Sequence, residues 1–267
     1  MELSVSREGS GDTLVLLHGF TGNHTSWESF VPAFAEKFRV LCVELPGHGR
    51  TPCPRDPGDA RLPEVADALA RILEAEGTGR AHFVGYSMGG RALLHFAVRY
   101  PRQVASMAVL SASPGLESEV ARRERRESDE ALAQRLETEG LEAFVARWMT
   151  QPLFATLADA DPVQLAAERA RKLSGTAEGF AGALRAMGPG WQPDLWPSLA
   201  TLPCPSLIVA GALDGRYLAM AERMVQELPR AQLAIVPAAG HSVLVEQPGR
   251  LKSLLCDWLR EQAGGDE

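Results

Sequence analysis

A serine between two glycines has the surroundings that most directly suggest chemistry in this chain. The segment Gly85-Tyr86-Ser87-Met88-Gly89 follows the pattern G-x-S-x-G, directly after an apolar run and before a helix-forming stretch. A serine on such a sharp strand-to-helix turn needs small neighbours two residues away on either side. The turn exposes the hydroxyl at the start of a helix, where the helix dipole favours negative charge. The pattern therefore predicts that Ser87 is a catalytic residue.

A serine hydroxyl needs a base to accept its proton, and the base needs an acid to orient it. His241 comes just after the last apolar run of the chain, and Asp214 comes just after the run before it. Taken alone, His241 also fits a solvated loop histidine. Three residues that each follow a strand converge at the carboxyl edge of a parallel sheet, so we predict a triad of Ser87, Asp214 and His241.

The elements that must position this triad are short apolar runs alternating with helix-forming stretches. Six runs are continuous rather than alternating, which is typical of strands covered on both faces. They span residues 13–17, 40–43, 82–85, 105–110, 206–209 and 233–236. Helix-like stretches span residues 64–76, 89–100, 217–228 and 250–262. The alternation predicts an α/β fold with a doubly wound, mostly parallel sheet.

One long interval breaks this alternation. Between about Gly115 and Ala200 there are helix formers and charged residues but no convincing strand. We expect a helical cap inserted between two core strands, over the sheet edge that carries the loops. The predicted division is a core of residues 1–114 and 201–267 and a cap of residues 115–200. The tail Ala263–Glu267 has the composition of a disordered end.

Composition limits the classes of partner. The chain has 267 residues, a formal net charge of −7, 45% hydrophobic residues and 23% charged residues. Net acidity argues against nucleic acid or an anionic membrane as the main partner. Neither a signal peptide nor a membrane span is evident, and the four cysteines follow no disulfide or metal-site pattern. We therefore expect a cytoplasmic protein; its oligomeric state, monomer or homodimer, is open.

A second motif points to an oxyanion hole. The turn Leu17-His18-Gly19-Phe20 follows the first long apolar run, as does the loop that supplies one oxyanion donor in α/β-hydrolases. The donors would be the backbone N–H groups of Phe20 and Met88, with His18 structural. Nearly the whole chain thus resembles the α/β-hydrolase superfamily, which hosts many different activities.

Further motifs are similar to one family within that superfamily. They are His18-Gly19-Phe20-Thr21-Gly22, Gly85-Tyr86-Ser87-Met88-Gly89-Gly90-Arg91, Gln151-Pro152-Leu153-Phe154 and Gln192-Pro193-Asp194-Leu195-Trp196. They resemble the 2-succinyl-6-hydroxy-2,4-cyclohexadiene-1-carboxylate synthases of menaquinone biosynthesis. The resemblance implies a lyase that eliminates pyruvate from 2-succinyl-5-enolpyruvyl-6-hydroxy-3-cyclohexene-1-carboxylate. The triad would abstract the proton next to the succinyl ketone, with no metal and no organic cofactor.

The same resemblance implies how a small tricarboxylate substrate is bound. Arg91 and Arg125 match carboxylate binders, and Lys172, with Arg171 just before it, takes the place of a third arginine. Tyr86 and Trp148 match residues that line the pocket. Lys occurs only at positions 37, 172 and 252, so 24 of the 27 basic residues are Arg. Genomic base composition also accounts for such an excess, and the run 122–126 equally fits a solvated helix face.

Two other classes of function fit the same residues. The triad would also serve a carboxylesterase or a C–C bond hydrolase, which would use Ser87 as a nucleophile and would not depend on Arg91. A binding protein that keeps the fold without catalysis is a further alternative, but an intact triad argues against it.

Overall fold

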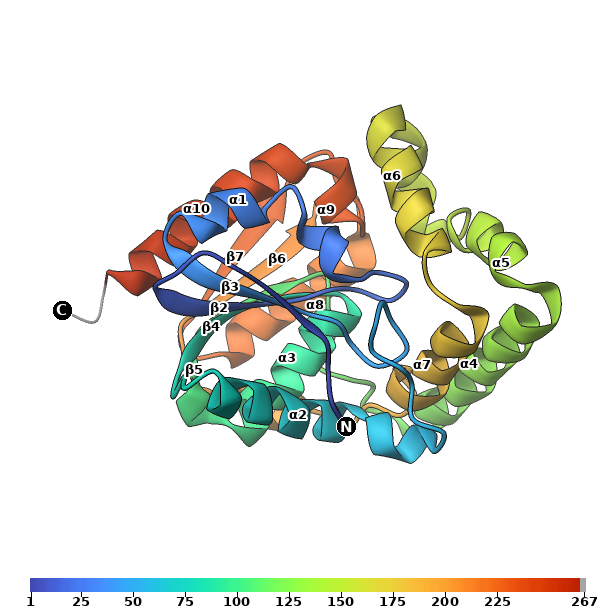
Figure 1. Ribbon diagram of the computed structural model, residues 1–267, viewed down its shortest axis with the longest axis horizontal. Coiled ribbons are helices and arrows are strands. Elements are labelled where there is room, and N and C mark those ends of the chain that lie inside the picture. Colours follow the sequence, from blue (N-terminus) through green and yellow to red (C-terminus); the bar gives the residue numbers. More distant parts are fainter. Residues whose placement is uncertain (265–267) are drawn as a thin grey trace.

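The computed structural model describes residues 1–264, and its centre is a seven-stranded sheet (Figure 1). The strand order is β1-β3-β2-β4-β5-β6-β7, and every pairing is parallel except that of β1 with β3. The strands are β1 (Val5–Glu8), β2 (Asp12–Leu17), β3 (Phe38–Val43), β4 (Ala81–Tyr86), β5 (Val104–Leu110), β6 (Ser206–Gly211) and β7 (Ala231–Val236). Residues 265–267, part of the tail expected to be disordered, lie outside the described residues.

Helices cover both faces of the sheet. The core helices are α1 (Val31–Ala35), α2 (Leu62–Ala75), α3 (Met88–Arg99), α8 (Gly215–Glu227), α9 (Val243–Glu246) and α10 (Pro248–Ala263). Side chains alternate along β2, so that Val15 and Leu17 pack in one hydrophobic cluster with α2, α3 and α8. Leu14 and Leu16 pack in the other, with α1, α9 and α10. The predicted doubly wound sheet is therefore confirmed.

The two edge strands differ from the sequence-based expectation. β1, which the apolar runs did not identify, has only four residues and none of them is buried. β7 was predicted to be covered on both faces, but only Val236 is buried and Ile235 is 46% exposed. β7 is the last strand of the sheet, so one side has no neighbour, and helices cover it less completely than the central strands.

The predicted helical cap is present between β5 and β6 (Figure 1, right). It comprises α4 (Glu119–Glu139), α5 (Leu141–Trp148), α6 (Pro162–Leu173) and α7 (Ala177–Met187), with a 3₁₀ segment at Pro152–Asp159. The cap has its own apolar cluster around Leu136, Phe144 and Phe180. We propose that it spans residues 115–200, whose last residues pack back against the core through Leu199.

Short 3₁₀ helices connect several of these elements. They span His24–Trp27, Pro57–Ala60, Pro101–Gln103 and Trp196–Thr201. Among residues 1–264, no helix combines the length and the apolar character needed to cross a bilayer.

A buried histidine on α3 makes stability depend on pH. His95 is 5% exposed, and its Nε2 has no hydrogen-bond partner among the described residues. Burial, helped by the nearby charge of Arg91, lowers the pKa of His95 to about 4. The unfolded chain therefore binds a proton at His95 as the pH falls below about 6.5, while the folded chain stays neutral until about 4.

We therefore expect the free energy of unfolding to fall between pH 6.5 and 4, with His95 contributing up to about 1.4 kcal/mol per pH unit. His95→Leu should reduce this slope without abolishing it, because burial also lowers the pKa values of His18 and His48. Urea unfolding at pH 7, 6 and 5 measures the slope. Parallel pH dependences for the variant and the wild type would contradict the assignment.

Candidate active site

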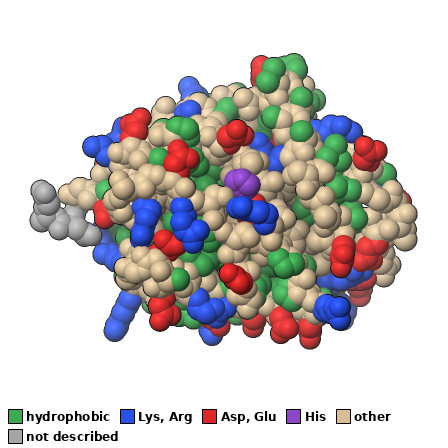
Figure 2. Space-filling view, viewed as in Figure 1, with side chains coloured by type: hydrophobic (Ala, Val, Ile, Leu, Met, Phe, Trp, Pro, Cys, Tyr) green, Lys and Arg blue, Asp and Glu red, His purple; other side chains and the backbone are tan. Residues whose placement is uncertain are grey.

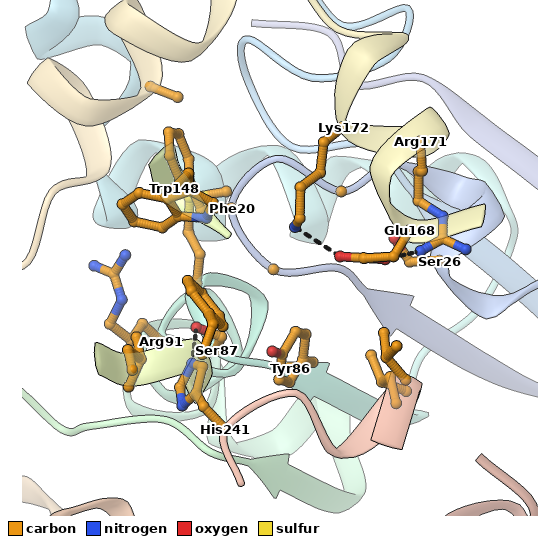
Figure 3. Close-up of a pocket in the computed structure, with 18 of the residues that line it drawn as sticks. Phe20, Ser26, Tyr86, Ser87, Arg91, Trp148, Glu168, Arg171, Lys172 and His241 are labelled. Atoms are coloured by element: carbon orange, nitrogen blue, oxygen red, sulfur yellow. Dashed lines mark hydrogen bonds and ion pairs between the residues drawn. The ribbon is translucent and has the colours of Figure 1, made fainter. Parts of the chain in front are cut away.

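The structure brings Ser87, His241 and Asp214 together at the carboxyl edge of the sheet. Ser87 Oγ lies 3.1 Å from His241 Nε2 (Figure 3). His241 Nδ1 lies 3.0 Å from Asp214 Oδ2. The other carboxylate oxygen of Asp214 accepts a hydrogen bond from Tyr217 N at the start of α8. His241 and Asp214 are both buried. The structure thus brings together the three residues predicted for the triad, in hydrogen-bond contact from serine to histidine to acid.

The turn that carries Ser87 is strained. Ser87 has φ 51° and ψ −109° between β4 and α3, a conformation that costs on the order of 1–3 kcal/mol for a residue with a side chain. Gly89 permits the turn, because a Cβ there would lie 2.2 Å from the carbonyl oxygen of Leu17 on β2. A Cβ on Gly85 would lie 2.6 Å from Gly89 O. The flanking glycines therefore allow β4 and α3 to approach closely enough to present the hydroxyl.

The His241 loop is held by a residue that sequence reasoning did not single out. The Glu246 carboxylate accepts hydrogen bonds from Gly240 N at 2.8 Å and from Ser242 N at 3.0 Å. These two N–H groups flank His241 on either side. Glu246 therefore fixes the backbone that aims the imidazole at Ser87.

The two expected oxyanion donors also lie at this edge. Met88 is the first residue of α3, so its N–H has no acceptor within that helix. Phe20 lies in the loop after β2, and both residues line the same cavity as Ser87. His18 is buried, where its Nε2 accepts a hydrogen bond from Leu45 N at 3.1 Å. Burial lowers the pKa of His18 to about 4, so it is a neutral structural residue, as expected.

A cavity of about 330 Å³ lies between the core and the cap, with Ser87 in its wall. Nine of the ten residues predicted for the site line it, and Asp214 lies behind His241. Aromatic rings form much of the wall: Trp148 lies 5.2 Å from Phe20 and 5.5 Å from Phe154, and Tyr86 lies 5.7 Å from His241, all between ring centroids. The sequence did not single out Phe154 for the site.

Arg91 is a buried cation in the wall of this cavity. Its side chain projects from α3 into the cavity wall (Figure 3) and donates a 2.6 Å hydrogen bond to the carbonyl oxygen of Met187. Among the described residues it makes no ion pair. Burial lowers the pKa of Arg91 to about 10, which still leaves it charged at neutral pH. Asp129 attracts the Arg91 guanidinium electrostatically without forming an ion pair with it, so donors of Arg91 stay open to an anionic ligand.

Arg125 also lines the cavity, but it shares its charge with a buried acid. Its Nε donates to Asp129 Oδ1 at 2.8 Å. The other oxygen of Asp129 has no partner in the described part of the chain, and burial raises the pKa of Asp129 despite Arg125 beside it. Only Nε of Arg125 is occupied within residues 1–264, which leaves its two terminal nitrogens for a ligand. By contrast, Arg122 and Arg126 pair with Glu119, and both are half-buried rather than on the solvated face that their run in the sequence also fitted.

Lys172 differs from Arg91 because it forms an ion pair with a buried carboxylate, which it shares with Arg171. It lines the cavity from α6 and is buried, where its Nζ pairs with Glu168 Oε1 at 2.6 Å and donates to Thr21 Oγ1 at 2.9 Å. Arg171 pairs with the same carboxylate (Figure 3). Burial by itself would raise the pKa of Glu168, but the charges of Lys172 and Arg171 hold it below its ordinary value. The sequence prediction included Lys172 and Arg171 but not Glu168, the carboxylate with which both of them pair.

The outer surface carries no comparable concentration of positive charge on the face shown in Figure 2. Basic and acidic side chains are interspersed there. The grouping of cations near Ser87 is therefore a feature of the cavity and not of that face. Asp129, Glu168 and Glu246 were not predicted for the site, although the i,i+4 spacing of Arg125 with Asp129 and of Glu168 with Lys172 could have indicated the first two.

Comparison with known proteins agrees with this geometry. The alpha/beta hydrolase fold family matches residues 12–248. The 2-succinyl-6-hydroxy-2,4-cyclohexadiene-1-carboxylate synthase of Escherichia coli O1:K1 / APEC is 33% identical over 247 residues, covering 92% of this chain and 93% of the relative. A Bacillus subtilis (strain 168) protein, to which the same activity is provisionally assigned, is 34% identical over 261 residues, covering 96% and 94%.

Solved structures give the same relationship. MenH from S. aureus superposes with a TM-score of 0.93 at 29% identity, covering 98% of this chain and 99% of that one. A thermophilic esterase from Thermogutta terrifontis has a TM-score of 0.86, also at 29% identity, covering 97% and 93%. The resemblance seen in the motifs is thereby confirmed: the chain belongs to the α/β-hydrolase fold family and, within it, to the family of 2-succinyl-6-hydroxy-2,4-cyclohexadiene-1-carboxylate synthases.

Proposed function

We propose that this protein is a lyase of menaquinone biosynthesis. It eliminates pyruvate from 2-succinyl-5-enolpyruvyl-6-hydroxy-3-cyclohexene-1-carboxylate to give 2-succinyl-6-hydroxy-2,4-cyclohexadiene-1-carboxylate. One observation carries the proposal: the Ser87–His241–Asp214 relay opens on a cavity whose wall holds Arg91, a buried cation that forms no ion pair among the described residues. A triad beside an unpaired buried guanidinium suits a substrate that carries carboxylates.

The reaction is a 1,4-elimination across the ring. The proton at C2, next to the succinyl ketone, leaves, and its electron pair forms the C2=C3 double bond. The former C3=C4 pair moves to C4=C5, and the C5–O bond breaks to release the enolate of pyruvate. One proton is lost and one is taken up by pyruvate, so the enzyme returns to its starting state without a covalent intermediate.

The residues of the triad supply the base. With Asp214 at Nδ1, the imidazole of His241 presents Nε2 to Ser87 Oγ, so Ser87 can take the C2 proton while His241 accepts the serine proton. The ketone oxygen gains negative charge as C2 loses its proton. The N–H groups of Phe20 and Met88 would hold that oxygen, as oxyanion donors hold a tetrahedral intermediate.

The cavity provides the rest of the specificity. Arg91 and the two terminal nitrogens of Arg125 can each receive a carboxylate, because no acid occupies them among residues 1–264. Trp148, Phe20 and Tyr86 would pack against the ring and exclude water, which strengthens each charged contact.

A second candidate function is ester hydrolysis by the same triad. Ser87 is placed as a nucleophile would be, and the esterase from Thermogutta terrifontis shares the fold at 29% identity. An esterase would accept neutral substrates and would not need a buried arginine in its pocket.

The two candidates are separated by one pair of assays. Purified protein is given the enolpyruvyl cyclohexene carboxylate, and pyruvate is followed with lactate dehydrogenase and NADH; p-nitrophenyl acetate is given in parallel. We expect rapid pyruvate release and little ester turnover. Efficient ester hydrolysis with no pyruvate release would refute the lyase.

Ser87→Ala should lower kcat for pyruvate release by at least about 10³-fold, because general-base catalysis contributes about 10²–10⁴ and the variant removes the group that relays the proton. Circular dichroism checks that the variant is folded. The matched control is Ser253→Ala on the exposed side of α10, which should leave the rate unchanged. Retention of more than a tenth of the activity would remove Ser87 from the reaction.

Arg91→Met should raise KM for the tricarboxylate by roughly 10- to 100-fold, since a hydrogen bond to a charged group is worth about 1.5–3 kcal/mol. Arg91→Lys should recover part of the loss, as it restores the charge without the planar fork. Steady-state kinetics measure both effects, with Arg102→Met on the surface as control. An unchanged KM would show that Arg91 does not bind the substrate.

A further inference from the structure

Thr21, the residue after Phe20, adopts a conformation that side chains rarely take. Its φ is 65°, in the left-handed region that disfavours β-branched residues. Such a residue persists only where surrounding contacts hold it, and it often lies where the backbone must be aimed. Here it adjoins the N–H of Phe20, the donor proposed for the oxyanion hole.

Three hydrogen bonds hold Thr21 in place. Its N–H donates to His48 Nε2 at 3.1 Å, and its hydroxyl donates to the carbonyl oxygen of Phe20 at 2.5 Å. Lys172 Nζ donates to the same hydroxyl oxygen at 2.9 Å. The first two contacts come from the core, whereas Lys172 belongs to α6 of the cap. The position of the Phe20 peptide therefore depends on a cation from the cap.

The end of α6 is tied to the same loop at two further points. Arg171 Nε donates to Thr25 Oγ1 at 3.2 Å, and Asn23 Nδ2 donates to Ser174 Oγ at 3.2 Å. Glu168 holds both cations of α6 in place (Figure 3). Cap and loop thus meet along residues 21–25.

We propose that Lys172 is a positioning residue for the oxyanion hole rather than a carboxylate ligand. Acting through Thr21, it aligns the Phe20 N–H and couples docking of the cap to the catalytic geometry. The inference rests on the proposed function only in taking Phe20 N–H as an oxyanion donor.

The contacts of the Lys172 ammonium group support this assignment. Lys172 pairs with Glu168 at 2.6 Å and donates to Thr21, whereas Arg91 forms no ion pair in the described part of the chain. Two of the three N–H donors of Lys172 are therefore used within the protein. The two buried cations of the cavity wall therefore have different roles: Arg91 attracts the substrate, and Lys172 shapes the loop.

Two substitutions test the contact from either side. Lys172→Met removes the charge and the donor at similar length, and Thr21→Val removes the hydroxyl while leaving the Lys172–Glu168 pair intact. Thr21→Ser keeps the hydroxyl and should therefore retain the activity that Thr21→Val loses. Lys37→Met is the matched control, because Lys37 is exposed. Thr21→Val keeps the test valid even where Lys172→Met fails to fold.

We expect both variants to lower kcat for pyruvate release by about 10- to 100-fold with KM changed by less than about twofold, somewhat below the 10²–10³ for full loss of an oxyanion donor. The double variant should lose no more activity than the less active of the two single variants, because the two residues act through one contact. A rise in KM at unchanged kcat, or additive losses, would overturn the proposal.

A neutral probe separates this inference from the proposed function. Diethyl 4-nitrophenyl phosphate phosphorylates a serine hydroxyl and releases 4-nitrophenol, and its phosphoryl oxygen needs the oxyanion donors but no carboxylate site. Labelling of Ser87, followed by mass, should slow in Lys172→Met and Thr21→Val by a factor similar to that in kcat. It should be unchanged in Arg91→Met. Wild-type rates in the two loop variants would sink the inference whether or not the protein releases pyruvate.

Discussion

The close approach of β4, α3 and β2 around the Ser87 turn is the constraint on which the site depends. Gly89 lies against the backbone of Leu17, so no side chain fits there, and Ser87 is forced into a left-handed conformation. That turn places the hydroxyl at the head of α3, beside the N–H of Met88 and within reach of His241. Because the central strands are buried on both faces, their packing can hold the strained turn.

The second requirement of the site is a set of positively charged side chains that the cavity shields from water. A net charge of −7 describes the whole chain and predicts little about a cavity of about 330 Å³. Within it, the cations differ in their ion pairs: Arg91 forms none among the described residues, and Arg125 uses one nitrogen on Asp129. Lys172 pairs with Glu168, which it shares with Arg171. Side chains of the same charge can therefore have different roles, depending on whether a buried acid pairs with them.

The cap contributes more than a cover. Its helices bring Arg125, Trp148 and Lys172 to the cavity, and α6 contacts the loop that holds Phe20. Fold alone does not decide the reaction, since an esterase with a TM-score of 0.86 shares this architecture. The difference between a hydrolase and a lyase rests on which groups the cap and α3 present to the substrate.

The sequence by itself determined the doubly wound sheet, the helical cap and the members of the triad. Each is encoded locally: strands by apolar runs, and Ser87, Asp214 and His241 by short motifs that follow them. Tertiary structure decided the partners. Lys172 meets Thr21, and Arg91 meets the carbonyl oxygen of Met187, only once the cap packs on the core. By contrast, Arg125–Asp129 and Glu168–Lys172 each lie four residues apart on one helix, so their spacing in the sequence already brings them together. The partial exposure of β7 follows from its place at the sheet edge. A contact between residues distant in the chain cannot be predicted from the sequence around either residue, because the two interact only after folding has brought them together.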